Sequence, residues 1–258
     1  MLWKSDLDII GNRMKKTLII LVLLTMVLSC RKVKDCFSSA GEEILNEFEL
    51  PEFDTLVIKD DFIVNLVQDS INYIQVSGYE SFVNATEFVV EQNSLIVQNN
   101  HKCKFSKPKS NHTKLFIHIN EISRIKLNSS SKFISQNELT NDDEIGLIIN
   151  SKYNEVDLKL NCNTFYYWNT HLNGGKITLE GDINILKLWN TSLGSVNAQN
   201  LITSGVLIDT DSKADITVNV SEKIDCTVRG HGNVYCYGNP VIIIKNDSTS
   251  TGRLIFVE

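Results

Sequence analysis

The sequence predicts an all-β protein: a right-handed β-helix, or β-solenoid, with coils of about 20 residues and a less regular β portion ahead of them. Three observations predict this class. Short alternating apolar runs divided by Asn, Ser and Thr favour strands and turns over helices. A phrase typified by "LKLWNTSLGS" (186–195) recurs at nearly constant steps. The chain of 258 residues, 42% of them hydrophobic, is long enough for one large core.

Residues 1–29 are predicted to be a signal peptide and not part of the fold. From Met14 the chain reads "MKKTLIILVLLTMVLSC", with two lysines, an apolar run of secretory length, and then Ser29 and Cys30. Asp6 and Asp8 do not suit a positive leader, so Met14 is the predicted start. The ending "VLSC" resembles a bacterial lipobox, in which the cysteine is lipidated and becomes the first mature residue. An ordinary signal peptide with an incidental cysteine is the alternative.

Residues 30–48 are predicted to link a lipid on Cys30 to the folded part. The segment begins "CRKVKD", which is locally basic and would lie near anionic headgroups. Several acyl chains give stable anchoring where one does not. We therefore expect a soluble domain tethered to the cell envelope, at the outer membrane. Within this linker, "GEEILNEF" (41–48) is compatible with a turn or two of helix.

Residues 49–258 are predicted to form a single domain, of which 49–120 is the irregular β portion. Its short alternating strands are "FDTLVIKD" (53–60), "FIVNLVQD" (62–69), "YIQVSG" (73–78), "SLIVQN" (94–99) and "KLFIHIN" (114–120). The long loop "HKCKFSKPKSNH" (101–112) precedes the last of them.

Residues 121–258 are predicted to form the regular coils. When the copies are aligned on the last apolar residue before each polar turn, the steps are 22, 18, 21, 20 and 20 residues, through Leu127, Ile149, Tyr167, Leu188, Ile208 and Val228. Another apolar residue stands two positions earlier in every copy, on the same face of the strand, at Ile125, Leu147, Phe165, Leu186, Val206 and Cys226.

A second alternating stretch follows each turn, with pairs such as Val156 and Leu158 or Ile177 and Leu179. The few side chains that one such unit buries cannot offset the entropy of ordering all its residues, so the units must stack. An ordinary β-sandwich is the alternative, but it does not predict that every second strand resembles its counterpart.

The residues next to the inward pairs point outward. One predicted outward column reads Asn128, Asn150, Trp168, Trp189, Asp209 and Arg229, and the neighbouring column includes Tyr166 and Lys187. Trp168 and Trp189 should therefore lie on adjacent coils, about 4.8 Å apart. A row of exposed aromatic rings suits stacking on sugars or anchoring a protein partner, so Tyr166, Trp168 and Trp189 are the predicted ligand-binding residues. The alternative is that the loop "THLNGG" (170–175) covers the rings and they extend the core.

Composition argues against several other classes. The formal charge is −6 and no basic stripe interleaved with aromatics is present, so nucleic acid is not an expected partner. No metal or other cofactor is predicted, because "HKC" (101–103) with His112 fits a solvated loop better than a metal cluster. The cysteines after Cys30 match no zinc pattern, and their odd number cannot all pair; Cys226 is predicted to lie in the core. The five cysteines after Cys30 are Cys36, Cys103, Cys162, Cys226 and Cys236.

Two rival functions remain open beside a binding role. A β-helical polysaccharide-degrading enzyme would need grouped carboxylates, often with a base. The candidates are Asp209, Asp211 and Asp215 in one turn, Glu180 and Asp182 elsewhere, and His171 and His231 in other turns. The other rival is a purely structural body that assembles with copies of itself or with other envelope proteins.

Two stretches, "DCFSSAGEEILNEFELPEFDTLVIKDDFIVNLVQ" (35–68) and "VRGHGNVYCYGNPVIIIKNDSTSTGRL" (228–254), resemble the bacterial family called putative auto-transporter adhesin, head GIN domain. Gly230, Gly232, Gly238 and Gly252 match its "GxG…G…G" ending. The resemblance covers about residues 35–256 and implies an exported, lipobox-bearing protein with a β-helical body, as in Bacteroidetes-like bacteria. It supplies no catalytic residue. We therefore expect an exported, lipid-anchored, non-enzymatic adhesin or glycan- or protein-binding module.

Overall fold

The computed structural model describes residues 41–102, 113–169, 173–247 and 250–257. Gly41–His101 and Pro108–Glu258 form one compact unit, and the fold described below is that of this unit. The second unit, Met1–Ala40 with Lys102–Lys107, lies almost wholly outside the described residues. The predicted signal peptide and Cys30 are therefore not described. In the described part, no helix is long and apolar enough to cross a membrane.

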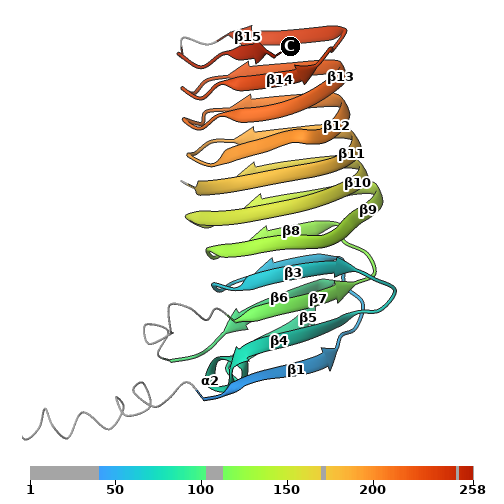
Figure 1. Cartoon of the computed structure of the whole chain (residues 1–258), viewed down its shortest axis with the longest axis vertical. Helices are drawn as coiled ribbons and strands as arrows, with labels where there is room; N and C mark the ends of the chain where they lie inside the picture. Colours follow the sequence, from blue (N-terminus) through green and yellow to red (C-terminus); the bar gives the residue numbers. More distant parts are fainter. Residues whose placement is uncertain (1–40, 103–112, 170–172, 248–249, 258) are drawn as a thin grey trace, which may run out of the picture. The chain divides into compact units, whose positions relative to one another are not determined.

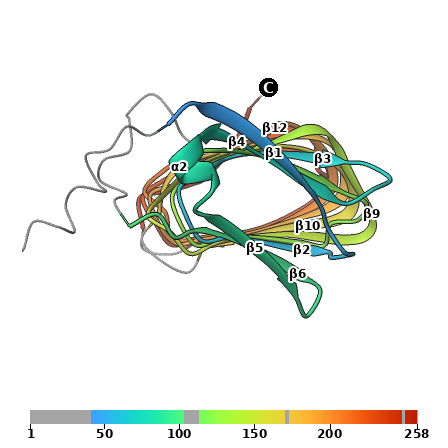
Figure 2. The ribbon, with the colours of Figure 1, turned by 90° about the horizontal axis from the view of Figure 1, so that it is seen from below.

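The unit is a β-solenoid of stacked parallel coils with a less regular part at its N-terminal end, which confirms the predicted fold class (Figure 1). Seen from below, the coils form a flattened ring with two opposite faces (Figure 2). Five long strands run along both faces. They are β9 (Ser131–Ile149), β10 (Tyr153–Asn169), β11 (Gly174–Asn190), β12 (Ser195–Thr210) and β13 (Ile216–Val228).

Each long strand bends near its middle, so its first half lies on one face and its second half on the other. The register shifts at the bends, for example between Thr178 and Glu180 where β11 pairs with β12, and such irregularities let a strand turn a corner. Gly181 stands at the bend of β11 with a φ of +118°, where a Cβ would lie 2.0 Å from the carbonyl oxygen of Leu160. We call the face formed by the second halves face A and the other face B.

The irregular part continues both faces toward the N-terminal end. On face A, β8 (Arg124–Leu127), β2 (Thr55–Ile58) and β6 (Ser94–Asn99) are parallel, and β5 (Thr86–Glu91) joins β6 as a hairpin. On face B, β3 (Ile63–Gln68) and β7 (Lys114–Ile119) are parallel, and β4 (Tyr73–Tyr79) and β1 (Glu43–Glu49) are antiparallel additions. The only described helix, α2 (Glu80–Val83), is one short turn.

Residues 41–48 do not form the turn of helix that the sequence allows. Glu43–Glu49 are strand β1, paired along its whole length with β4. The ladder hydrogen bonds of a sheet edge override the weak helix preference of an isolated acidic stretch.

At the C-terminal end, β14 (Val234–Gly238) and β16 (Leu254–Phe256) extend face B, and β15 (Ile242–Asp247) extends face A. The inward columns of face B have the predicted register. Val156 pairs with Ile177, Ile177 with Val196, Val196 with Ile216, and Ile216 with Val234. All five side chains are buried in one continuous core.

On face A the predicted columns are wrong at two places. Tyr167 pairs with Leu147 and not with Ile149, and Cys226, not Val228, pairs with Ile208. The inward column is therefore Ile125, Leu147, Tyr167, Leu188, Ile208 and Cys226. Because both slips are of two residues, the inward and outward faces of every strand are still as predicted.

The slips change the membership of the outward column. In the structure this column consists of Lys126, Ile148, Trp168, Trp189, Asp209 and Thr227. Asn128, Asn150 and Arg229 lie two residues farther along their strands, toward the turn. The predicted register was wrong here because the partner of Ile149 is Asn169, which is polar and yet buried. An alignment on the last apolar residue of each copy misses an inward position that a polar side chain occupies.

Candidate functional site

Trp168 and Trp189 lie directly opposite one another on the neighbouring strands β10 and β11 of face A. Both occupy outward positions. The Trp168 side chain is 48% exposed and Trp189 is partly exposed. Ile148 precedes them in the same column and Asp209 follows. The ladder fixes the two indoles on adjacent rungs, about 4.8 Å apart at the backbone.

Tyr166 lies in the neighbouring outward column and leans toward the N-terminal end of the stack. Its hydroxyl accepts a hydrogen bond from Nε of Arg124, 2.9 Å away and two rungs below. Its ring covers Gly146 on the rung between, where a Cβ would lie 2.0 Å from the ring. A side chain at residue 146 would displace the tyrosine ring, which occupies that space. The hydrogen bond that Arg124 donates to Tyr166 is also the largest cause that raises the pKa of Arg124.

A third pair of side chains borders these aromatics. Lys187 pairs with Tyr166 in the ladder, and its Nζ lies 3.4 Å from Oε2 of Glu144. Both side chains of this ion pair remain partly exposed, so its contribution to stability is small. We call the six residues the tryptophan surface: Trp168, Trp189, Tyr166, Arg124, Lys187 and Glu144. It combines a partly exposed aromatic centre with a charged border on a rigid sheet.

Of the sequence-predicted ligand-binding residues, the structure brings Trp168, Trp189 and Tyr166 together on one face. The loop proposed to cover them falls partly outside the described residues, at 170–172. The sequence pattern missed Arg124 and Glu144. Arg124 directly precedes the first inward residue of the repeat, Ile125, but the register that brings it beside Tyr166 depends on the two-residue slip.

Two of the acidic residues considered for catalysis, Asp209 and Asp215, make structural contacts. Asp209 forms an ion pair with Arg229, and Oδ1 of Asp215 accepts a hydrogen bond from the backbone N–H of Asn233 at 2.8 Å. His231 contacts Oγ1 of Thr251 at 2.7 Å, whereas His171 lies outside the described residues. Within the described ranges, no group of three or more His, Cys, Asp and Glu side chains could hold a metal ion. The metal alternative at residues 101–112 falls mostly outside those ranges.

Of the cysteines that lie in the described ranges, Cys162, Cys226 and Cys236 are free and buried in the core, and Cys226 was predicted to lie there. Burial raises the pKa of the Cys162 and Cys226 thiols to about 12 and that of Cys236 to about 11. Thiols with such pKa values are inert at neutral pH, so these residues serve as small core side chains.

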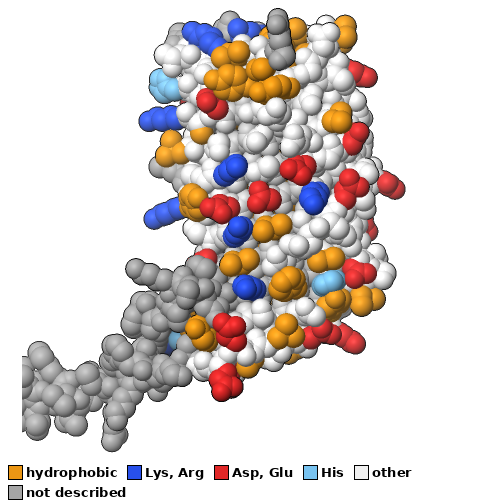
Figure 3. Space-filling model, in the orientation of Figure 1, with side chains coloured by type: hydrophobic (Ala, Val, Ile, Leu, Met, Phe, Trp, Pro, Cys, Tyr) orange, Lys and Arg blue, Asp and Glu red, His pale blue; other side chains and the backbone are white. Residues whose placement is uncertain are grey.

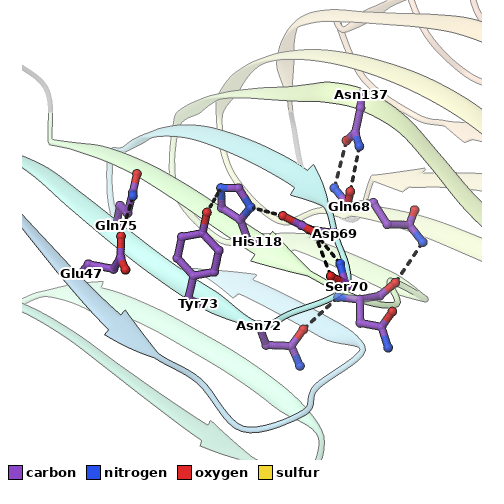
Figure 4. Close-up of polar contacts among 10 residues, drawn as sticks. Glu47, Gln68, Asp69, Ser70, Asn72, Tyr73, Gln75, His118 and Asn137 are labelled. Carbon is purple, nitrogen blue, oxygen red and sulfur yellow. Dashed lines mark hydrogen bonds and ion pairs between the residues drawn. The ribbon is translucent and has the colours of Figure 1, made fainter.

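The structure also assembles a polar array that the sequence did not indicate (Figure 4). Nδ1 of His118 on β7 lies 3.1 Å from Oδ2 of Asp69, and its Nε2 lies 2.9 Å from the hydroxyl of Tyr73 on β4. A neutral imidazole that donates to Asp69 accepts from Tyr73 at its other nitrogen. The backbone N–H of Ser70, and then His118, hold the pKa of Asp69 below its ordinary value. The array ties β4 and β7 to the turn after β3.

A shallow groove of about 630 Å³ lies beside this array, and Tyr73 forms part of its wall. The other lining residues are mostly polar or acidic, among them Glu47, Glu49, Glu52 and Asn72. Nothing in the sequence could have located this groove, since its walls come from segments about 70 residues apart that antiparallel pairing brings together.

Comparison with known proteins agrees with the fold. The family model described as "Putative auto-transporter adhesin, head GIN domain" matches residues 52–240. No curated protein matches the chain.

Solved structures of other proteins are similar to this chain over most of their own length. A putative adhesin from Bacteroides fragilis is 22% identical with a TM-score of 0.71, and the match covers 84% of this chain and 97% of that one. A putative lipid binding protein from Parabacteroides distasonis is 16% identical with a TM-score of 0.61, covering 84% and 98%. A putative adhesin from Parabacteroides merdae is 13% identical with a TM-score of 0.57, covering 84% and 97%. These likenesses concern the fold.

Proposed function

We propose that this chain, which belongs to the family described as putative auto-transporter adhesin, head GIN domain, is an exported, lipid-anchored and non-enzymatic envelope protein that binds a glycan through its tryptophan surface. The observation that carries the proposal is the in-register pair Trp168 and Trp189 on an open sheet face. The family description supports an adhesive role in general terms and an envelope location.

The chemistry of the surface favours a saccharide. Indole rings present flat apolar faces that match the C–H faces of pyranose rings. Arg124, Lys187 and Glu144 at the border offer donors and acceptors for ring hydroxyls or acidic groups. Because parallel strands hold both indoles, little conformational entropy is lost on binding. An open face also admits a polymer, which an enclosed pocket does not.

A binding role rather than catalysis is supported by what the acidic residues do. Asp209 and Asp215 already have partners within the fold, Arg229 and the backbone N–H of Asn233. The export and anchoring parts of the proposal rest on the leader that ends in "VLSC" with Cys30.

A glycan array probed with the mature chain tests the binding role. The mature chain and all its variants should carry Cys30→Ser, so that no lipid is attached. We expect selective binding that the double variant Trp168→Ala, Trp189→Ala abolishes while its melting temperature stays within a few degrees of the parent. Tyr153→Ala, which removes another exposed aromatic from face B, is the matched control and should bind normally. Array binding that survives the double variant, or a double variant that unfolds, would refute the proposal.

Metabolic labelling with a clickable fatty acid tests the anchor separately. The chain should be labelled, and Cys30→Ser should abolish labelling while Cys36→Ser leaves it intact. Labelling that persists in Cys30→Ser would place the lipid elsewhere.

A further inference from the structure

Two outward columns of face A carry the tryptophan surface, and each has a cation at its N-terminal end. On consecutive rungs the first column consists of Trp189, Trp168, Ile148 and Lys126. The second consists of Lys187, Tyr166, Gly146 and Arg124. Because the ring of Tyr166 covers Gly146, the second column has no gap. Lys126 lies two rungs from Trp168, roughly 10 Å along the solenoid axis.

The charges of this part of face A are not balanced. The outward positions of β8 and of the second halves of β9, β10 and β11 contain three cations, Arg124, Lys126 and Lys187. They contain one carboxylate, Glu144, which already forms the ion pair with Lys187. Neither Arg124 nor Lys126 forms an ion pair with a described residue. The formal charge of the chain is −6, so this positive excess is local.

Carboxylates that are near in sequence lie off this face, and face B has a different pattern. Asp142 and Asp143 lie on the bend of β9, where its register with β10 shifts. Face B, seen from the side of β1 and β4, has charged side chains of both signs spread over its middle (Figure 3). There the register places Glu155 opposite Lys176. The unbalanced cations are thus a property of the columns that carry the tryptophans.

Arg124 is held in one orientation by the tryptophan surface. Its Nε donates to the hydroxyl of Tyr166 at 2.9 Å, and its terminal nitrogens make no hydrogen bond with a described residue. The terminal nitrogens of a guanidinium form a planar fork that can bind a carboxylate through two hydrogen bonds. The Lys126 side chain also makes no hydrogen bond within the described ranges, and its ammonium can act as a second point of positive charge.

We infer that the glycan bound on the tryptophan surface is an acidic polysaccharide, whose chain lies along the solenoid axis and whose carboxylates meet Arg124 and Lys126. This inference rests on the proposed function and names the class of sugar. The indoles follow one another along the axis, and the two cations continue the same columns, so an extended chain reaches both. A uronic acid ring offers a C–H face to an indole and a carboxylate to a cation.

A nucleic acid would also bring flat rings and negative charge. It binds through many phosphate contacts, and two cations on a chain of charge −6 supply too few of them. They suit a polymer with about one charge per sugar.

Paired polysaccharides test the inference. Polygalacturonate, alginate and hyaluronate are immobilised, each beside its carboxyl-reduced form, and probed with the mature chain carrying Cys30→Ser. We expect at least one acidic chain to bind about tenfold or more tightly than its neutral form. Raising the sodium chloride from about 50 to 500 mM should weaken binding to the acidic form several-fold. Binding to the neutral form should hardly change, because no charges meet there.

Single substitutions then locate the carboxylate contacts. Arg124→Gln and Lys126→Gln should each weaken binding to the acidic form about tenfold and leave binding to the neutral form as it is. Lys126→Gln removes no hydrogen bond between described residues, so it stays informative if Arg124→Gln disturbs folding. Lys176→Gln, which removes an exposed lysine from face B, is the matched control and should bind like the parent.

The outcomes separate this inference from the proposed function. Equal binding of acidic and neutral forms that Trp168→Ala, Trp189→Ala abolishes would overturn the inference and leave the proposed function standing. A preference for acidic forms that survives both Arg124→Gln and Lys126→Gln would also overturn it. So would equally tight binding of a single-stranded oligonucleotide of matched charge. If no glycan binds, on this panel or on the array, both are wrong.

Discussion

Asn169 on β10 donates a hydrogen bond from Nδ2 to Oδ1 of Asn190 on β11, 2.9 Å away, and both side chains are buried. The backbone N–H of Thr191 donates to Oδ1 of Asn169 at 2.9 Å, and Nδ2 of Asn190 donates to the carbonyl of Gly194 at 2.8 Å. The two asparagines occupy inward positions of the core, where face A meets the turn and where apolar side chains would otherwise lie. Their hydrogen bonds to Thr191 and Gly194 hold the turn after β11 in place.

Removing one member of this pair should destabilise the fold. Asn190→Ala leaves the Asn169 amide and the Gly194 carbonyl without their buried partner, at a cost of about 1–3 kcal/mol in the free energy of unfolding. Urea denaturation of the mature chain measures it. Asn184→Ala, which breaks an exposed Asn–Asn bond to Asn163, is the control and should cost under about 0.5 kcal/mol. Equal effects of the two variants would contradict a special role for the buried pair.

The contact between Gly146 and Tyr166 predicts a coupled pair of substitutions. Gly146→Ala places a methyl group inside the tyrosine ring's space and should cost about 1–3 kcal/mol, because the ring must move and lose Arg124. In a Tyr166→Ala background the space is free, so the same change should cost almost nothing. A double-mutant cycle from denaturation curves tests this, and additive effects would show that the ring does not lie over Gly146.

The buried cysteines predict a loss of stability at alkaline pH. Folding raises the pKa of Cys236 from 9.0 to about 11 and that of Cys226 to about 12, so the unfolded chain loses these protons first as pH rises. The free energy of unfolding should therefore be unaffected by these thiols below pH 9 and fall progressively above it. Urea midpoints at pH 7 to 10.5 measure this.

The double variant Cys226→Ala, Cys236→Ala is the control and should show a shallower decline. At pH 8 the folded parent should resist alkylation at both residues, as followed by mass spectrometry. Rapid labelling without unfolding would mean that the thiols are accessible.

The sequence predicted those parts of the fold that depend on local periodicity. The inward columns of face B were correct because every coil has an apolar residue there, as Val156, Ile177 and Val196 do. On face A the predicted register was wrong by two residues at Asn169, because a polar residue in the sequence gives no sign that its side chain is buried within a hydrogen-bonded turn. The strand character of β1 could not be inferred either, because it depends on β4, some 30 residues away.

Only that part of the candidate site which follows from the repeat could be predicted from the sequence. Trp168 and Trp189 come from successive regular coils, so their alignment followed from the repeat. Arg124 could not be placed beside Tyr166, because that contact depends on the two-residue slip between β9 and β10. The array of Asp69, His118 and Tyr73 comes from the irregular part, where pairing is not set by a repeat length.

Tryptophan fluorescence shows whether the tryptophan surface is where a glycan binds. The chain has 3 tryptophans, and removal of the predicted signal peptide takes away Trp3 and leaves the two of the tryptophan surface. On titration with a glycan selected on the array, the emission of the mature chain should shift to the blue, and acrylamide quenching should fall with the same saturation curve as binding. Trp168→Phe and Trp189→Phe should each retain part of the response. Saturable glycan binding by calorimetry with unchanged emission and unchanged quenching would contradict the account.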